Sequence, residues 1–139
     1  MGSQVIAICA FGLIAALPAA AQSVAPGAQS ASVTAEVAAA YDAAFQETLS
    51  NPADPPTLLK FATLAVKVGD LEGAISALDR LLLIDGDNPE VQLELGVLYF
   101  RLGSLDGAKP YLEAASRSRR ASPETKGRAN EFLKEASRP

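Results

Sequence analysis

Two segments of this 139-residue chain match each other at an offset of 34 residues: "KVGDLEGAISALDRLLLIDGDNPE" begins at Lys67, and "RLGSLDGAKPYLEAASRSRRASPE" begins at Arg101. The shared positions include small residues and leucines, among them the pairs Gly69/Gly103, Ala74/Ala108 and Leu78/Leu112. A period of this length corresponds to two helices and their turns, a unit that cannot bury its apolar face alone. The chain is therefore expected to stack such units into an all-α fold.

Apolar residues recur at three- and four-residue spacing along most of the chain, which is the pattern of amphipathic helices. The predicted helices cover a segment from Val33 to the Asn51-Pro52 break and then residues 56–68, 71–84, 89–102, 105–117 and 123–136. Gly69 and Gly103 suit left-handed turns between helices. Asp70 and Ser104 follow these glycines and suit the N-cap of the next helix. Strand signals are weak throughout.

The repeated units resemble the tetratricopeptide repeat, which has a 34-residue helix–turn–helix period. The places of the family pattern hold Leu58, Phe61, Ala62, Ala65, Ala74, Leu78 and Gly86 in the first unit, and Gln92, Leu95, Gly96, Tyr99, Ala108, Leu112 and Arg120 in the second. Leu58 and Gln92 replace the usual Trp, and Gly86 and Arg120 replace the closing Pro. The resemblance implies a right-handed α-solenoid over residues 33–137, with full repeats at 55–88 and 89–122, a degenerate half-repeat before them and a capping helix at 123–137.

The first 21 residues, "MGSQVIAICAFGLIAALPAAA", are predicted to be a secretory signal peptide. An uncharged apolar run is followed by Pro18 and an A-x-A site, with cleavage expected before Gln22. A retained membrane anchor is the alternative, although 17 apolar residues are at the lower limit for spanning a bilayer. Residues 22–32 are predicted to be a flexible linker. The only cysteine, Cys9, would leave with the signal peptide, which favours a periplasmic product.

The sequence contains no recognisable catalytic arrangement of residues. There is no histidine, so the commonest general base and imidazole metal ligand are lacking. "DGDN" at Asp85–Asn88 lacks the glycine and glutamate spacing of a calcium loop and is interpreted as an inter-repeat turn. No phosphate-binding glycine motif occurs. We therefore expect no enzyme activity, no cofactor and no metal.

Family resemblance implies a concave groove that is lined by the first helix of each unit and receives a peptide or helix of a partner protein. The implied groove residues are Leu59, Thr63, Val66, Lys67, Leu93, Val97, Phe100 and Arg101. Lys67 and Arg101 repeat at one edge, so the expected ligand carries apolar side chains and some negative charge. The alternative is that another helix or a capping segment covers these residues.

The charges are unevenly distributed along the chain. From Glu36 to Glu113 there are 13 acidic and 5 basic residues, whereas residues 114–139 contain 7 basic and 3 acidic residues. The basic residues have no interleaved aromatics, so no nucleic-acid partner is expected. Arg117, Arg119 and Arg120 are interpreted as a solvated helix end. A docking patch for an acidic partner or an anionic membrane surface is the alternative.

Together these observations predict a non-catalytic protein–protein interaction scaffold in the bacterial periplasm. The alternative is the N-terminal repeat region of a longer outer-membrane β-barrel protein involved in surface export or assembly. Membrane contact is expected only through an uncleaved N-terminal segment or an attached barrel. The sequence specifies neither the partner nor the oligomeric state.

Overall fold

The computed structural model describes the backbone of residues 26–138 and the side chains of residues 34–138. The predicted signal peptide, Cys9 and residues 22–25 lie outside the described residues. Over the described range the chain forms helices and no strand: α1 (Pro26–Ser50), α2 (Pro55–Val68), α3 (Leu71–Ile84), α4 (Pro89–Arg101), α5 (Leu105–Arg117) and α6 (Pro123–Ala136).

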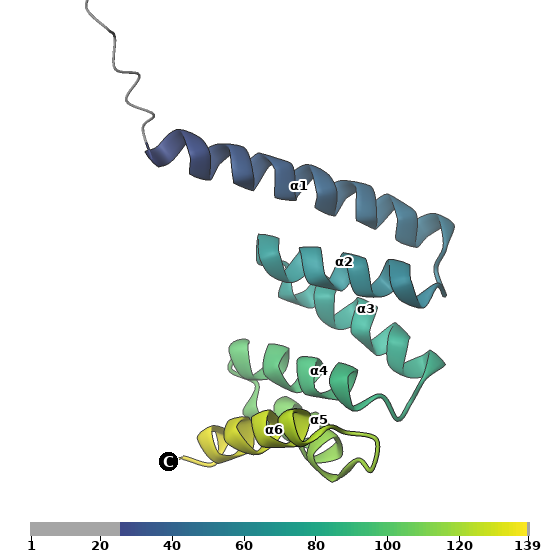
Figure 1. The fold of residues 1–139 in the computed structure, drawn as a ribbon, viewed down its shortest axis with the longest axis vertical. Helices are drawn as coiled ribbons and strands as arrows, with labels where there is room; N and C mark the ends of the chain where they lie inside the picture. The colour runs from purple at the N-terminus through teal and green to yellow at the C-terminus, as the bar shows by residue number, and fades with distance from the viewer. Residues whose placement is uncertain (1–25, 139) are drawn as a thin grey trace, which may run out of the picture.

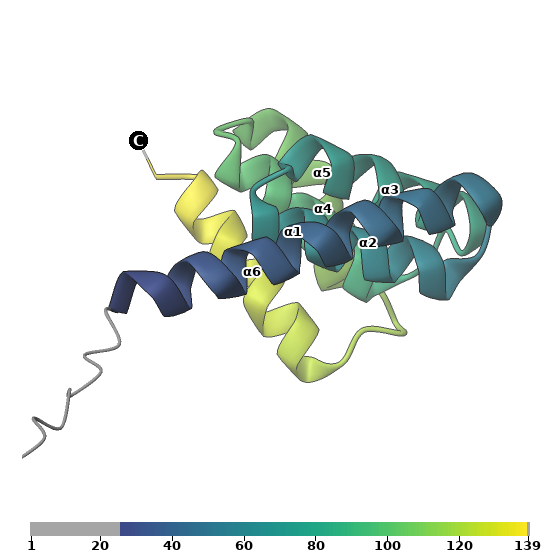
Figure 2. The ribbon, with the colours of Figure 1, turned by 90° about the horizontal axis from the view of Figure 1, so that it is seen from above.

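The helices stack from α1 at one end to α5 and α6, which lie together, at the other (Figure 1). α2 pairs with α3 and α4 pairs with α5 as antiparallel hairpins, and α3 packs on α4 between the two units. Seen from above, α6 runs across the direction of α1 (Figure 2). The all-α solenoid of helical hairpins that the sequence predicted is confirmed.

α1 differs from its prediction at its N-terminal end. It begins at Pro26 rather than near Val33, so the part of the predicted linker from residue 26 to residue 32 is helical. Pro26 stands at the helix start, where a proline loses no intrahelical hydrogen bond and its φ angle is already helical. Composition alone suggested a linker because Ser and Gly are common in linkers. The Ala and Gln residues of the same stretch are nevertheless compatible with a helix.

Short capping motifs set the other helix boundaries. Gly69 (φ 87°) and Gly103 (φ 75°) adopt the predicted left-handed conformation between paired helices. Asp70 caps α3 by accepting a hydrogen bond from the Gly73 N–H at 3.0 Å. Ser104 stands at the N-cap of α5 without a side-chain capping bond. Because such signals act within a few residues, the bounds of α3, α5 and α6 agree with those expected from the sequence.

The core has two parts. The larger part contains residues of α1, α2, α3 and α4 and includes the fully buried Leu58 and Leu95. The second part joins α4, α5 and α6 and consists of Leu93, Ala108, Leu112, Ala115 and Ala129. Among the helices in residues 26–138, none combines the length and the apolar character that crossing a bilayer requires.

Candidate functional site

A groove lies between α2 and α4, which are the first helices of the two repeats. We call it the α2–α4 groove; its cavity of about 270 Å³ is lined by Leu59, Ala62, Thr63, Val66, Lys67, Leu78, Glu94 and Leu98. The four residues predicted from the first unit, Leu59, Thr63, Val66 and Lys67, all line this one cavity. The groove is therefore mainly aliphatic, with one basic and one acidic side chain.

The packing of the helices explains why this space is open. No Cα atoms of α2 and α4 lie within 8 Å of each other, whereas α3 packs against both helices. Leu78 of α3 lines the groove between them, because a helix lying behind two others presents its side chains to the gap. α4 and α6, by contrast, pack directly on each other. Within the described residues, the gap between α2 and α4 therefore stays accessible, whereas α6 closes the space beside α4.

The two charged residues of the groove differ in their partners. Glu94 lies 3.6 Å from Arg128 of α6, so part of its charge is balanced within the molecule. Lys67 is exposed and forms no ion pair within residues 34–138. The Thr63 hydroxyl donates to the Leu59 carbonyl at 2.8 Å. The charge left for a ligand is therefore the Lys67 ammonium group, at the C-terminal end of α2.

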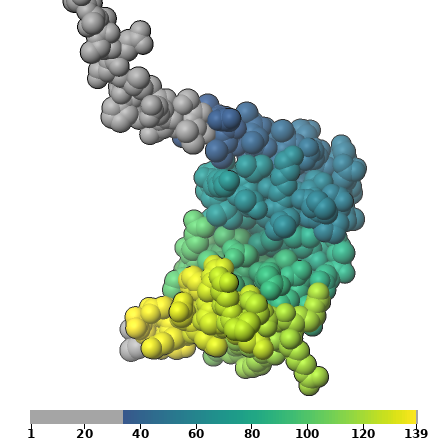
Figure 3. All heavy atoms as spheres, viewed as in Figure 1, coloured from purple at the N-terminus to yellow at the C-terminus, as the bar shows by residue number. Residues whose placement is uncertain are grey.

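The residues predicted from the second unit lie elsewhere. Leu93 is only 2% exposed and belongs to the second core. Val97 and Phe100 pack against that core, and the Phe100 ring meets the Phe132 ring edge-on at 5.3 Å between centroids. Arg101 is exposed but does not line the α2–α4 groove. For Leu93, Val97 and Phe100 the structure shows the alternative arrangement, a capping helix that covers them: α6, drawn in yellow in Figure 3.

The three arginines of the basic segment do not act as one patch. Arg120 binds the Asp85 carboxylate through two hydrogen bonds of 2.8 and 3.0 Å and donates to the Asp87 carbonyl at 2.7 Å. The Arg120 guanidinium lowers the pKa of Asp85 below its ordinary value. Arg117 pairs with Glu113 in the preceding turn at 3.0 Å. Arg119 is exposed and forms no ion pair with a described residue.

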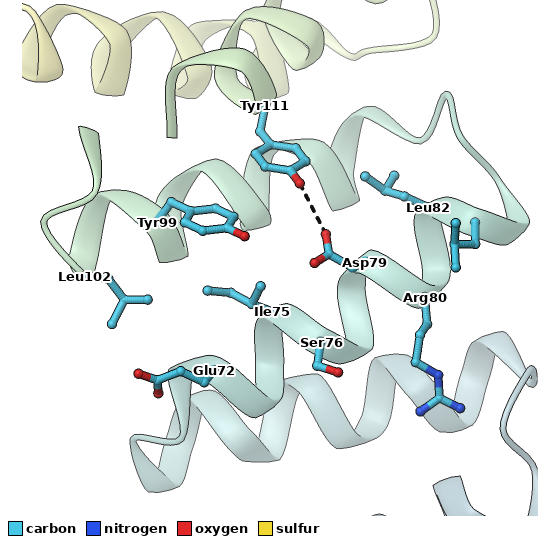
Figure 4. Close-up of a pocket in the computed structure, with 10 residues that line it drawn as sticks. Glu72, Ile75, Ser76, Asp79, Arg80, Leu82, Tyr99, Leu102 and Tyr111 are labelled. Carbon is cyan, nitrogen blue, oxygen red and sulfur yellow. Dashed lines mark hydrogen bonds between the residues drawn. The ribbon is translucent and has the colours of Figure 1, made fainter. Parts of the chain in front are cut away.

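A second cavity, of about 740 Å³, lies between α3 and α5, with α4 behind it (Figure 4). We call it the α3–α5 cavity; it is lined by Glu72, Ile75, Ser76, Asp79, Arg80, Leu82, Leu83, Tyr99, Leu102 and Tyr111. The rings of Tyr99 and Tyr111 stack at 5.5 Å with an interplanar angle of 6°. The Tyr111 hydroxyl donates to Asp79 at 3.3 Å. Burial raises the pKa of Tyr111 above its ordinary value, and the Asp79 carboxylate adds to this.

Sequence reasoning did not identify the α3–α5 cavity. A signal was present in the difference between the repeats, since Tyr111 stands where the first unit has Ala77. A large aromatic residue that replaces a small one at a repeat position needs space outside the close contact between the two helices of a hairpin. Within residues 34–138 no three His, Cys, Asp or Glu side chains cluster as a metal site would require.

Comparison with known proteins identifies the repeats. Residues 65–127 match the tetratricopeptide repeat family. The structure is similar to the crystal structure of PcrH from Pseudomonas aeruginosa, with a TM-score of 0.56 and 18% sequence identity over 75% of this chain and 93% of that chain. No curated protein matches the sequence. The family match lies within the helical repeat region and agrees with the tetratricopeptide-repeat resemblance that the sequence pattern predicted.

Proposed function

We propose that this protein is a non-catalytic interaction scaffold of the bacterial periplasm that binds a peptide or helix of a partner protein in the α2–α4 groove. The tetratricopeptide fold supports an interaction role. The observation that carries the proposal is the groove itself, where Leu59, Val66 and Leu98 line a space that no helix in residues 26–138 fills. Apolar clefts with a few polar groups are the usual form of a peptide-binding site.

The charge of the groove defines the class of ligand. Lys67 forms no ion pair within residues 34–138, while Glu94 is close to Arg128. A ligand with aliphatic side chains and one carboxylate near Lys67 would bury apolar surface and gain an ion pair. The aliphatic contacts would provide most of the affinity, because an exposed ion pair contributes only about 0–1 kcal/mol.

A capture experiment tests the groove. The purified protein is used to capture partners from periplasmic extract, and the captured proteins are quantified by mass spectrometry for the wild type, for V66E/K67E and for K109E. Lys109 is exposed on α5 and lies outside both cavities, so K109E repeats the Lys-to-Glu part of the change at a distant place. We expect V66E/K67E to reduce the amount of captured protein at least about tenfold, and K109E to leave that amount unchanged. Equal capture by V66E/K67E would exclude the groove as the binding site.

The periplasmic location is supported by the apolar run from Val5 to Leu17 and by the A-x-A site that ends at Ala21. Expression in a Gram-negative host, followed by cell fractionation and N-terminal sequencing, tests it. The expected result is a periplasmic protein that begins at Gln22. A cytoplasmic protein that retains residues 1–21 would contradict the location without affecting the groove.

A further inference from the structure

The α3–α5 cavity is separate from the α2–α4 groove, and the two share no lining residue. Helix periodicity explains how the same helices can serve both. Leu78 of α3 and Leu98 of α4 line the groove, whereas their sequence neighbours Asp79 and Tyr99 line the cavity. Adjacent residues of a helix point about 100° apart, so they reach different surfaces. The cavity therefore offers a second surface that a groove ligand leaves free.

The apolar part of the cavity is unusually accessible. Leu83 is 87% exposed and Leu102 is 42% exposed, and both line the cavity beside the half-buried Leu82. A single exposed leucine is ordinary on a protein surface, but several apolar side chains gathered around one hollow are typical of an interaction site. The open face of the cavity thus favours an aliphatic contact.

The aromatic part of the cavity is held in place. The rings of Tyr99 and Tyr111 stack nearly parallel. The hydrogen bond from the Tyr111 hydroxyl to Asp79, drawn in Figure 4, fixes the Tyr111 ring. A guanidinium group stacks favourably on a tyrosine ring and binds a carboxylate with paired hydrogen bonds. Tyr111 and Asp79 provide these two features side by side.

The charges of the cavity lining also favour a basic ligand. Glu72 and Asp79 are the acidic residues of the lining, and Arg80 is its one basic residue. The Arg80 guanidinium already donates to the carbonyl of Pro52, in the turn between α1 and α2. Two carboxylates against one guanidinium leave the lining with a net negative charge, which attracts a basic side chain.

We propose that the α3–α5 cavity is a second docking surface, which takes a partner-protein segment that carries an arginine beside aliphatic side chains. The arginine stacks on Tyr111 and pairs with Asp79 or Glu72, while the aliphatic side chains contact Leu82, Leu83 and Leu102. The expected ligand has the opposite charge to that of the α2–α4 groove. The protein can then hold two different segments at once.

Peptide selection tests this surface without knowledge of the natural partner. A random peptide display library is selected on the immobilised full chain. The selected peptides are also tested on a K67E variant, because weaker binding to K67E identifies the peptides that bind in the α2–α4 groove. We expect a group of peptides with Arg next to Leu or Ile that binds the wild type and K67E equally. L83S and D79N should each weaken these peptides about tenfold. Both variants should fold, because Leu83 projects into solvent and the amide oxygen that D79N introduces can still accept the hydrogen bond from Tyr111.

The matched control is L49S, which removes a leucine that is 62% exposed on α1 and does not line the cavity. L49S should bind the selected peptides as the wild type does. Selection of acidic peptides, or of no peptide that is sensitive to L83S, would overturn the proposal. So would concentration-dependent self-association of the wild type that L83S abolishes, because the occupant would then be a second copy of this chain. Circular dichroism of each variant identifies any loss of fold.

Discussion

At the scale of single residues, the repeat depends on how closely two helices approach. A Cβ atom on Gly96 of α4 would lie 2.6 Å from Leu112 side-chain atoms and 3.2 Å from the Leu112 backbone nitrogen on α5. Leu112 is fully buried, so it has little freedom to move away. Gly127 in α6 is the opposite case, because a Cβ there meets nothing within 4 Å. The two helical glycines thus separate the effect of packing from that of helix propensity.

We predict that G96A destabilises the protein by about 1–2 kcal/mol, because the cost of overpacking exceeds the gain in helix propensity. G127A should stabilise it by up to about 1 kcal/mol, since alanine favours the helix and no neighbour has to move. Urea unfolding followed by circular dichroism measures both values. A stabilising G96A would show that α4 and α5 can separate without cost.

At the scale of whole helices, α6 decides which part of the array can bind. Its Phe132 ring contacts the Phe100 ring, and its Leu133 packs against the same core as Val97 and Phe100, the positions that would otherwise extend the groove to the second repeat. α6 is nevertheless a polar helix overall, and only Thr125 and Ala129 are buried along it. A helix held by so few apolar contacts depends strongly on each of them.

We predict that F100A increases amide hydrogen exchange in α6 by about tenfold or more and leaves exchange in α2 and α3 unchanged, because the lost ring contact is local. The control is R101A, at the neighbouring exposed position on the same helix, and it should not change amide exchange in α2, α3 or α6. Exchange measured by mass spectrometry distinguishes the helices. A uniform increase over all helices would mean that α6 unfolds only together with the rest of the protein.

The helices were largely predictable from the sequence because their signals are local. Gly69, Asp70 and Pro123 set helix ends through backbone geometry and capping within a few residues. The four groove residues of α2 were also predictable, since the family resemblance fixes the side of the helix on which they lie. The contact of Phe100 with α6 was not predictable, because spacing shows that a residue is apolar but not which helix covers it. The Tyr99–Tyr111 pair and the Arg120 contacts were not predictable either, because their residues come together from separate helices and turns.

At the scale of the whole molecule, Arg120 joins the end of the second repeat to the turn that closes the first. It holds the Asp85 carboxylate and the Asp87 carbonyl, and Ser118 donates to Asp87 at 3.3 Å. Arg120 stands at the repeat position that Gly86 occupies in the first unit. The segment that appeared from sequence to be a basic surface thus also links the two repeats.

We predict that R120Q lowers the melting temperature slightly at pH 7, and that its difference from wild type shrinks as the pH falls below about 4. The pKa of Asp85 is lowered in the folded state by Arg120, so the ion pair stabilises the fold above the unfolded pKa and is lost as the pH falls through the folded pKa. Asp87 and Glu90 also face Arg120. Thermal melts from pH 7 to pH 3 measure the difference.

The control for this experiment is R117Q, because Arg117 pairs only within its own helix, four residues from Glu113. R117Q should have a smaller effect on the melting temperature, since such exposed pairs within a helix contribute only about 0.3–0.5 kcal/mol. An R120Q difference that is as large at pH 3 as at pH 7 would assign the effect to the Asp87 carbonyl contact rather than to the Asp85 carboxylate.

The contrast between the two ends of the stack limits how copies of this protein could associate. α1 leaves Phe45 42% exposed and Leu49 62% exposed, whereas α6 presents mainly polar and charged side chains. Two copies that met through α1 would be related by a two-fold axis, and each free end of the pair would be an α6 helix. Within residues 34–138, no apolar end would remain for a third copy. Any association through that edge would therefore stop at a closed dimer and could not continue into a filament.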